Sequence, residues 1–470
     1  MSDPITLQLD DIYSKQKRYK EQSKQLRSEG RISLLKKLHA HIQDRQEEIK
    51  TAIYQDFGKS PIETDITEIF AASFEIKEII KNLKKWMKDK PVGKSLLFAT
   101  VKAYLHYEPK GNSLIITPWN YPFQLPITHL ASSIAAGNTA ILKLSEFTPH
   151  INQVIKQLIA DTFSPEHVFV VEGEAEITTH LLNRKFDHIH FTGSPTVGKI
   201  IMAAAAKNLT DITLELGGKS PAFIDKNVNI QQVVKNLIWA KFVNAGQTCI
   251  APDYLIVDQQ IATQFEQVFK EELTIAFGQN PIESPDYARI INDKQFDRLT
   301  ESLEDAKAIG AQIIIGGSSD RSTRYMAPTL VKNVSSTNKL MQEEIFGPIL
   351  PVVYVQQVNE GIKMVNAMEK PLALYIFSKD QNYISHILRN TTSGGTCIND
   401  AMIHILHPNL PFGGVNNSGI GQSFGWYGFK AFSHERAVAQ VRLMPMSKLF
   451  WFPYSNKTLK ILSWMKRFVG

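Results

Sequence analysis

The chain has 470 residues, of which 43% are hydrophobic and 21% are charged, the composition of an ordinary soluble globular protein. This length predicts two or three lobes rather than one small core. The net charge of +6 comes from residues 437–470, which carry six Lys and Arg and no acidic side chain, while the rest of the chain holds 46 basic and 46 acidic residues. A nucleic-acid groove is therefore excluded, because it would spread basic residues over a working face.

Cysteine use and hydropathy indicate the compartment. The two cysteines, Cys249 and Cys397, lie far apart, which excludes a disulfide scaffold, and no Cys/His cluster has the spacing of zinc ligands. Residues 1–11 lack the apolar core of a signal peptide, and no apolar run reaches the length of a membrane span. We therefore expect a cytoplasmic protein without a metal site.

The secondary-structure pattern predicts an α/β fold with two doubly wound parallel sheets. Residues 5–90 show helical, heavily charged patterns, residues 101–109 alternate like a strand, and residues 113–116 are typical of a buried strand. Strands and helices then alternate in two series. The first comprises 139–144 (strand), 150–162 (helix), 167–171 (strand), 175–182 (helix) and 187–191 (strand); the second comprises 230–244 (helix), 254–257 (strand), 261–273 (helix) and 312–315 (strand). Such alternation is typical of βαβ units, so we expect two α/β lobes.

Two segments carry groups suited to covalent chemistry. Cys249 stands among small residues in the run Phe-Val-Asn-Ala-Gly-Gln-Thr-Cys-Ile-Ala-Pro at 242–252. Glu215 lies upstream on an apolar strand, directly before Leu216 and a pair of glycines. A thiolate attacks carbonyl carbon well, and a carboxylate among apolar neighbours can activate the water that frees the product.

A third segment predicts an anion site. The chain lacks a convincing G-x-G-x-x-G, but residues 191–200 combine a strand, a tight turn at Gly193 and Ser194, and Pro195 at the start of a helix. The same run fits the Walker A pattern except that Ile200 stands where a magnesium-binding Ser or Thr is required, which argues against a nucleotide triphosphatase. A helix N-terminus of this kind suits a pyrophosphate. Lys143 ends another apolar strand, where doubly wound sheets place ligands.

Taken together, these segments resemble the aldehyde dehydrogenase superfamily over nearly the whole chain. The resemblance also includes Thr-Pro-Trp-Asn-Tyr-Pro at 117–122, Lys-Leu-Ser-Glu at 143–146, Glu-Glu-Ile-Phe-Gly-Pro at 343–348 and Pro-Phe-Gly-Gly at 411–414. Within the superfamily the chain is most similar to class 3, the group of fatty aldehyde dehydrogenases. The reasons are the short N-terminus, the residues 247–254 around the cysteine, and the endings at 432–434 and 452–454. Residues 423–429 depart from the class, because they are aromatic where it has a basic segment.

The resemblance implies a mechanism and its residues. Cys249 forms a thiohemiacetal, the Asn120 amide and the Cys249 N–H hold the oxyanion, and Glu215 activates the water that hydrolyses the thioester. NAD or NADP is the cofactor. Lys143 and Glu344 are expected to hold its ribose hydroxyls and Phe346 to pack near the nicotinamide. The full expected cofactor set is Trp119, Lys143, Glu146, Gly193, Ser194, Glu344 and Phe346. The expected substrate is a medium- or long-chain aliphatic or aromatic aldehyde.

The resemblance also implies domains and a homodimer. We expect a Rossmann-like cofactor lobe at 1–94 and 113–222, a catalytic lobe at 223–408, an oligomerisation arm at 95–112 and 409–445, and a basic amphipathic tail at 446–470.

Two alternative functions are weighed against hydrolytic oxidation. A coenzyme-A-acylating relative can lack the glutamate base, so Glu215 argues against it. A catalytically idle protein on the same fold would have lost Cys249, Glu215 or Asn120, and all three are present. His188 and His190 on one strand face, and His404 and His407 on a loop, are expected to serve the core or the surface rather than a metal.

The tail has two interpretations. From residue 455 onward, Leu459, Leu462, Met465 and Phe468 fall at helical spacing among four basic residues. The helix is too short to span a bilayer. It either docks on the enzyme or its partner subunit, or lies on anionic lipid as a peripheral membrane contact.

Overall fold

A computed structural model describes residues 4–93, 98, 100–443 and 445–469. Its first sheet has six strands in the order β17-β7-β6-β3-β4-β5. Five of them are parallel to one another: β3 (Asn112–Ile116), β4 (Thr139–Lys143), β5 (Val168–Val171), β6 (His188–Thr192) and β7 (Asp211–Glu215). The short β17 (Gly419–Ile420) pairs antiparallel with β7 at the edge. Strands β3, β4 and β6 are buried throughout, as expected of a parallel sheet covered on both faces.

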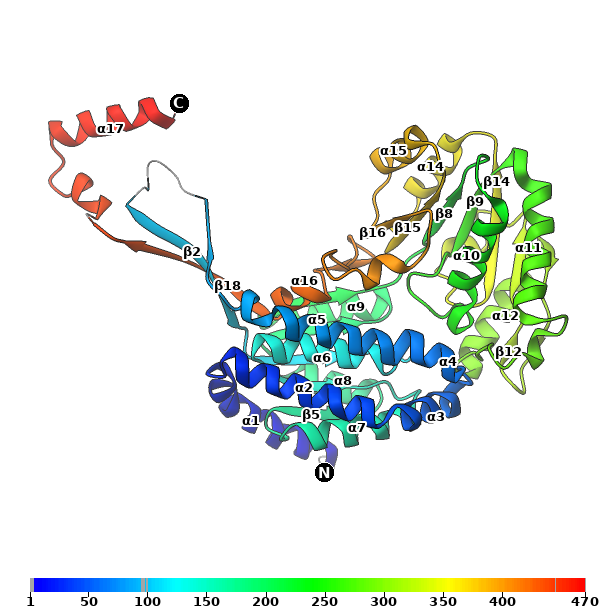
Figure 1. Cartoon of the computed structure of the whole chain (residues 1–470), viewed down its shortest axis with the longest axis horizontal. Helices are drawn as coiled ribbons and strands as arrows, with labels where there is room; N and C mark the ends of the chain where they lie inside the picture. Colours follow the sequence, from blue (N-terminus) through cyan, green and yellow to red (C-terminus); the bar gives the residue numbers. More distant parts are fainter. Residues whose placement is uncertain (1–3, 94–97, 99, 444, 470) are drawn as a thin grey trace.

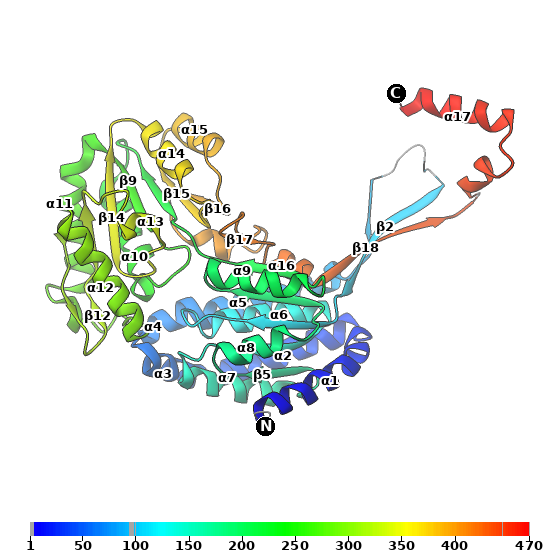
Figure 2. The same cartoon turned by 180° about the vertical axis from the view of Figure 1, so that it is seen from behind.

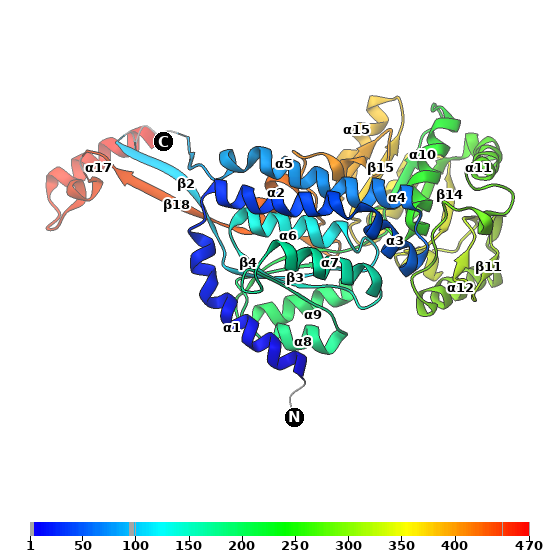
Figure 3. The same cartoon turned by 60° about the horizontal axis from the view of Figure 1, so that its bottom comes forward.

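Helices cover both faces of this sheet. Figure 3 shows α6 and α9 on opposite sides of β3 and β4. Alternate side chains of β3 serve the two faces: Leu114 packs in the cluster that includes Ile201 of α9, and Ile115 in the cluster that includes Ile134 of α6. The helices of this lobe are α1 (Pro4–Lys24), α2 (Ser28–Asp44), α3 (Gln46–Phe57), α4 (Pro61–Thr64), α5 (Ala71–Trp86), α6 (Gln124–Ala136), α7 (Pro149–Thr162), α8 (Ala175–Leu182) and α9 (Pro195–Ala206).

A second sheet has seven strands in the order β10-β13-β14-β9-β8-β15-β16. Adjacent strands in this sheet are parallel, except that β10 pairs antiparallel with β13. The strands are β8 (Pro221–Ile224), β9 (Tyr254–Asp258), β10 (Gln312–Ile315), β13 (Thr329–Lys332), β14 (Ile349–Val355), β15 (Ala373–Phe377) and β16 (Gly395–Ile398). Helices α10 (Ile230–Phe242), α11 (Ala262–Phe277), α12 (Asp293–Ala308), α14 (Val358–Ala367) and α15 (Gln381–Asn390) complete this lobe (Figure 1). The prediction of two parallel α/β lobes is confirmed.

A three-stranded antiparallel arm projects from the first lobe (Figure 2). It consists of β1 (Lys90–Pro91), β2 (Val101–Pro109) and β18 (Ser433–Val441). At its far end the chain continues into the short helix η7 (Met446–Phe450) and into α17 (Asn456–Val469), in agreement with the helical spacing of the tail. No described helix is long and apolar enough to cross a membrane.

Residues 409–445 are divided between the first lobe and the arm. Strand β17 extends the first sheet, and α16 (Gly425–Ala431) packs on α5 and α6. Phe429 of α16 is buried, and Trp426 contacts the rings of Trp86 and Tyr107. Only β18 of this segment joins the arm, because the aromatic side chains of α16 anchor the preceding residues to the first lobe.

Candidate active site

An apolar pocket lies where the two lobes meet and is lined by residues of both. Cys249 and Glu215 both line it, so the structure brings the two sequence-predicted reactive groups to one cavity. Most of its other side chains are apolar: Ile66, Ala71, Phe74, Leu125, Trp239, Ile250, Met402, Ile403, Ile405, Leu406, Pro408, Phe412 and Phe424. The polar remainder is small and includes Tyr121, Thr192 and Thr248.

The loop before Cys249 has an unusual backbone. Helix α10 ends at Phe242, and Asn244 and Ala245 follow with φ of 56° and 52°. The Asn244 N–H donates to the Glu63 carboxylate over 2.8 Å, and its side-chain amide donates to the Asn120 carbonyl over 2.8 Å. Non-glycine residues in left-handed conformations persist where the surroundings fix them, and they cluster at functional sites.

The thiol of Cys249 is partly exposed to the pocket, yet it is hard to ionise. Burial raises its pKa, and the negative charges of Glu344 and Glu215 raise it further. At physiological pH the side chain is therefore a neutral thiol.

Glu215 ends β7 and is held by several polar groups. The Ser423 hydroxyl donates to Oε1, and the Thr192 hydroxyl donates to Oε2 over 3.2 Å. His129 Nε2 lies 3.4 Å from Oε2. The carboxylate is 3% exposed, so the two hydroxyl contacts fix its orientation at the pocket wall.

Asn120 lies beside the cysteine loop, as expected for an oxyanion donor. Its side-chain Nδ2 donates one hydrogen to the carbonyl of Gln247, two residues before Cys249, over 3.0 Å. The same amide carries a second hydrogen. Its role toward an oxyanion stays a prediction.

Lys143 and the turn at Gly193 and Ser194 lie at the carboxyl ends of β4 and β6, the two strands that flank β3. Lys143 Nζ is 3.2 Å from a Glu146 oxygen, and its side chain is buried. Ser194 caps α9 by accepting from the Val197 N–H over 3.4 Å, while the Gly193 N–H donates to the Glu215 carbonyl over 3.0 Å. The first turn of α9 is exposed, which leaves its N-terminus open to an anionic ligand.

Glu344 and Phe346 approach this region from the second lobe. Burial raises the pKa of Glu344 to about 8, and a hydrogen bond from the Gly218 backbone opposes the rise. A side chain at Gly217 would overlap the Glu344 carboxylate, so the lack of a side chain there lets the carboxylate take this position. Phe346 packs edge-on against Trp119, with ring centroids 5.4 Å apart. The predicted cofactor residues therefore come from both lobes.

Sequence reasoning missed two groups beside Glu215. Ser423 belongs to the aromatic segment 423–429, and no motif in the sequence marks its hydroxyl as a partner of Glu215. His129 occupies α6, far from both catalytic motifs in the sequence. Burial and the neighbouring His129 hold the pKa of His190 well below its usual value, so the His190 ring is neutral at physiological pH.

The model of the aldehyde dehydrogenase family matches residues 6–438. The chain belongs to the aldehyde dehydrogenase family. It is 43% identical over 432 residues to the 4,4'-diaponeurosporen-aldehyde dehydrogenase of Staphylococcus aureus (strain NCTC 8325 / PS 47), covering 92% of this chain and 94% of that protein. It is 42% identical over 439 residues to aldehyde dehydrogenase family 3 member B2 of Mus musculus, covering 93% and 91%. The solved substrate-bound state of Staphylococcus aureus AldH has a TM-score of 0.92 at 40% identity, covering 97% of this chain and 99% of that one.

These relatives confirm the class 3 resemblance and make the protein an oxidoreductase acting on aldehydes. More distant aldehyde dehydrogenase folds include PnpE, solved with nicotinamide adenine dinucleotide (25% identity, TM-score 0.85, covering 94% of this chain and 91% of that one). They also include the glyceraldehyde-3-phosphate dehydrogenase GapN of Methanocaldococcus jannaschii, complexed with NADP (25% identity, TM-score 0.83, covering 93% and 94%).

Proposed function

We propose that this aldehyde dehydrogenase oxidises an apolar aldehyde to its carboxylic acid with NAD or NADP. The observation that carries the proposal is the shared pocket, in which Cys249 and Glu215 line one apolar cavity. A nucleophile and a base that share a cavity can act in turn on one carbonyl carbon.

In the proposed mechanism, the Cys249 thiol passes its proton to water in the pocket as its sulfur attacks the aldehyde carbon, and the product is the oxyanion of a thiohemiacetal. The second amide hydrogen of Asn120 and the Cys249 N–H stabilise the oxyanion. NAD(P), when bound, supplies the acceptor for the hydride that leaves this carbon and so yields a thioester. Glu215, oriented by Ser423 and Thr192, then takes a proton from the water that hydrolyses the thioester and releases the acid.

The residues present fit a dinucleotide. The open N-terminus of α9, with Gly193 and Ser194 in its turn, suits the pyrophosphate, and Lys143 and Glu344 would bind the ribose hydroxyls. Phe346, packed on Trp119, offers a flat wall to the nicotinamide. Glu146 is 35% exposed and paired with Lys143, so its carboxylate is not fixed against a 2′-phosphate, and we expect both NAD and NADP to serve.

The pocket favours a medium- or long-chain aliphatic or an aromatic aldehyde. Its walls are built from isoleucine, leucine, methionine and phenylalanine side chains, which gain from burying alkyl groups. Each buried methylene contributes about 0.8 kcal/mol, or roughly fourfold in kcat/KM. One relative carries the name 4,4'-diaponeurosporen-aldehyde dehydrogenase.

A chain-length series tests this function. NADH absorbance is followed on addition of acetaldehyde, hexanal and decanal, each with and without coenzyme A. We expect kcat/KM to rise with chain length and coenzyme A to have no effect. A preference for acetaldehyde would contradict the apolar substrate, and a requirement for coenzyme A would favour the acylating alternative.

We further propose that the arm pairs two cytoplasmic subunits and that the tail serves as a peripheral contact. Helix α17 stands away from both lobes in Figure 1, and Leu459 and Trp464 are 63% and 61% exposed. We therefore favour contact of α17 with a partner subunit or with anionic lipid over docking on the chain's own lobes. Co-sedimentation with anionic vesicles separates these two, comparing the full chain with one truncated after Pro445. If both stay in the supernatant at low salt, lipid contact is ruled out and the partner subunit remains.

A further inference from the structure

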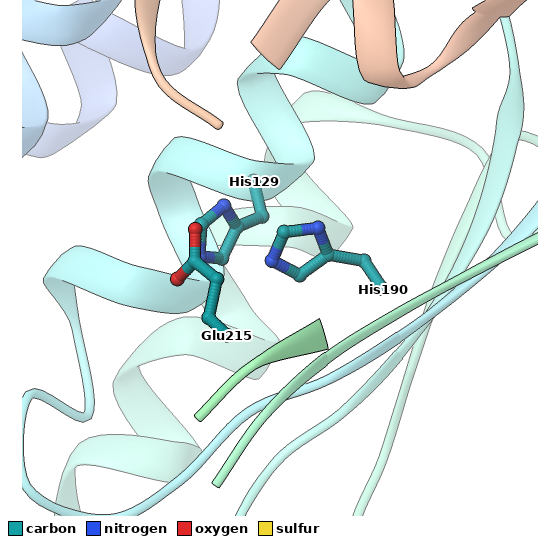
Figure 4. A group of neighbouring side chains, drawn as sticks. All are labelled: His129, His190 and Glu215. Atoms are coloured by element: carbon teal, nitrogen blue, oxygen red, sulfur yellow. The ribbon is translucent and has the colours of Figure 1, made fainter. Parts of the chain in front are cut away.

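Two histidines and the catalytic carboxylate form a buried cluster. His129 comes from α6, His190 from β6 and Glu215 from β7, and Figure 4 shows the two rings facing each other beside the carboxylate. One ligand atom from each residue lies within 4.8 Å of the others. The three side chains are at most 3% exposed.

The nitrogens of this cluster lack ordinary partners. Among the residues that the structure describes, neither ring nitrogen of His190 has a hydrogen-bond partner, and Nε2 of His129 makes no hydrogen bond and only approaches Glu215 Oε2 at 3.4 Å. The two ring centroids are 3.8 Å apart, and His190 stacks on Phe432 on its other side. A buried polar atom without a partner costs about 1–3 kcal/mol, so the two unpartnered nitrogens of His190 beside the His129–Glu215 pair call for a ligand.

We propose that this cluster binds a divalent transition cation such as Zn²⁺, which reversibly blocks the catalytic base. Two imidazole nitrogens and one carboxylate form a set of ligands that zinc accepts, with a fourth position left to water. His129 Nε2 and Glu215 Oε2 are 3.4 Å apart, close to the roughly 3.3 Å between two ligands of one tetrahedral zinc ion.

The ion has a route to the cluster. Glu215 and Phe424 line the substrate pocket, and the His129 ring lies 5.6 Å from the Phe424 ring, centroid to centroid. Neither His190 nitrogen meets a second residue that would orient the ring in the described part of the chain. Such outer partners typically raise metal affinity about 10–100-fold, so their absence indicates a weak, reversible site rather than a resident ion.

The functional consequence follows from the role proposed for Glu215, on which this inference rests. A cation on the carboxylate takes the lone pair that would accept the proton of the attacking water. Thioester hydrolysis then slows, whereas attack by Cys249 does not use Glu215. Bound zinc should therefore lower steady turnover and leave the first turnover intact.

The kinetic test compares NADH bursts with and without Zn²⁺ at micromolar free concentrations, with EDTA as reversal. In the unmodified enzyme we expect steady turnover to fall at least tenfold while the burst amplitude stays. His129→Leu and His190→Phe should each weaken this inhibition at least tenfold. His404→Gln is the matched control, because His404 is also buried with both nitrogens unpartnered and should leave the inhibition unchanged.

Two results would overturn the proposal. If zinc inhibited both cluster variants as strongly as the unmodified enzyme, or if it removed the burst together with steady turnover, zinc would be bound at Cys249 instead. A binding measurement keeps the site testable even if aldehyde oxidation fails: Cys249→Ser should bind one Zn²⁺ by calorimetry, and Cys249→Ser with His190→Phe should bind none. Retained binding in the double variant would contradict the site itself.

Discussion

At the scale of residues, the ionisation of Cys249 depends on burial and on the carboxylates around it. The Cys249 pKa is raised by burial and by the carboxylates of Glu344 and Glu215, so the thiol stays protonated until its surroundings change. Cys397 is buried too, and its pKa is raised to about 11, but it does not line the pocket. Cys249 therefore differs from Cys397 by its access to the pocket and not by a lower pKa.

Replacing the nucleophile tests its assignment. Cys249→Ala should abolish aldehyde oxidation, because no other group at the pocket can form the covalent intermediate. NAD binding, followed by quenching of tryptophan fluorescence, should persist, since the expected cofactor residues are untouched. Cys397→Ala serves as the control and should keep full activity. Appreciable turnover in Cys249→Ala would show that the nucleophile is another group.

Removing the charge at Glu344 should make Cys249 more reactive. Above its pKa of about 8 the Glu344 carboxylate is ionised and opposes thiolate formation. Glu344→Gln should therefore speed alkylation of Cys249 by iodoacetamide at about pH 9 and change it little at about pH 6.5, where the native carboxyl is already neutral. Mass spectrometry of the Cys249 and Cys397 peptides measures both rates at once. An acceleration that does not depend on pH, or that appears equally at Cys397, would contradict this electrostatic coupling.

At the scale of elements, the polar groups of the site lie at the ends of strands and helices. Glu215 and Thr192 end adjacent parallel strands, and Gly193 begins the turn into α9. Helix α5 contributes Glu75, whose carboxylate accepts from the Gly425 N–H at the start of α16 over 2.6 Å. This bond joins two helices that are far apart in sequence at one wall of the pocket.

Glu75 should make stability depend on pH. Burial raises its pKa to about 7, with Glu78 adding to the rise. The pKa of a glutamate in the unfolded chain is about 4.3. Between about pH 4.3 and pH 7 the folded chain therefore binds one more proton than the unfolded chain, and stability is lost as pH rises through about 7. Glu75→Gln keeps an oxygen for the Gly425 N–H and removes the ionisation. We expect the free energy of unfolding of Glu75→Gln, measured relative to that of the native protein, to rise by about 1–3 kcal/mol from about pH 5 to about pH 8.

Denaturant titrations at both pH values measure this gain. Glu304→Gln on an exposed part of α12 should show no such change. A constant difference between Glu75→Gln and the native protein at both pH values would mean that Glu75 ionises normally.

The alternation of strands and helices allowed most elements to be predicted, because period and chain order carry that information locally. Helix 175–182 matches α8, and the expected strand at 139–144 differs from β4 by one residue. His129 and Ser423 could not be predicted in the same way. Their importance depends on α6 and the segment before α16 meeting at Glu215, and no local pattern encodes that meeting.

At the scale of the whole molecule, residues 409–432 join the lobes. They leave the second sheet, add β17 to the first and bring Ser423 to Glu215 and Phe424 to the pocket. The arm and α17 then continue away from both lobes, as Figures 1 and 2 show. One continuous segment therefore contributes a wall of the pocket, a hydrogen bond to Glu215 and one strand of the arm.

The pre-steady-state kinetics of Glu215→Gln test the central claim most directly. Removing a positioned general base typically slows the step it serves about 10²–10⁴-fold. If Cys249 forms a thioester that Glu215-activated water hydrolyses, the variant mixed with decanal and NAD should release one equivalent of NADH per active site at close to the native rate. Turnover should then nearly stop, with the acyl group retained on Cys249 in mass spectra. An equal loss of burst and steady rate, with no acyl-enzyme detected, would contradict the account.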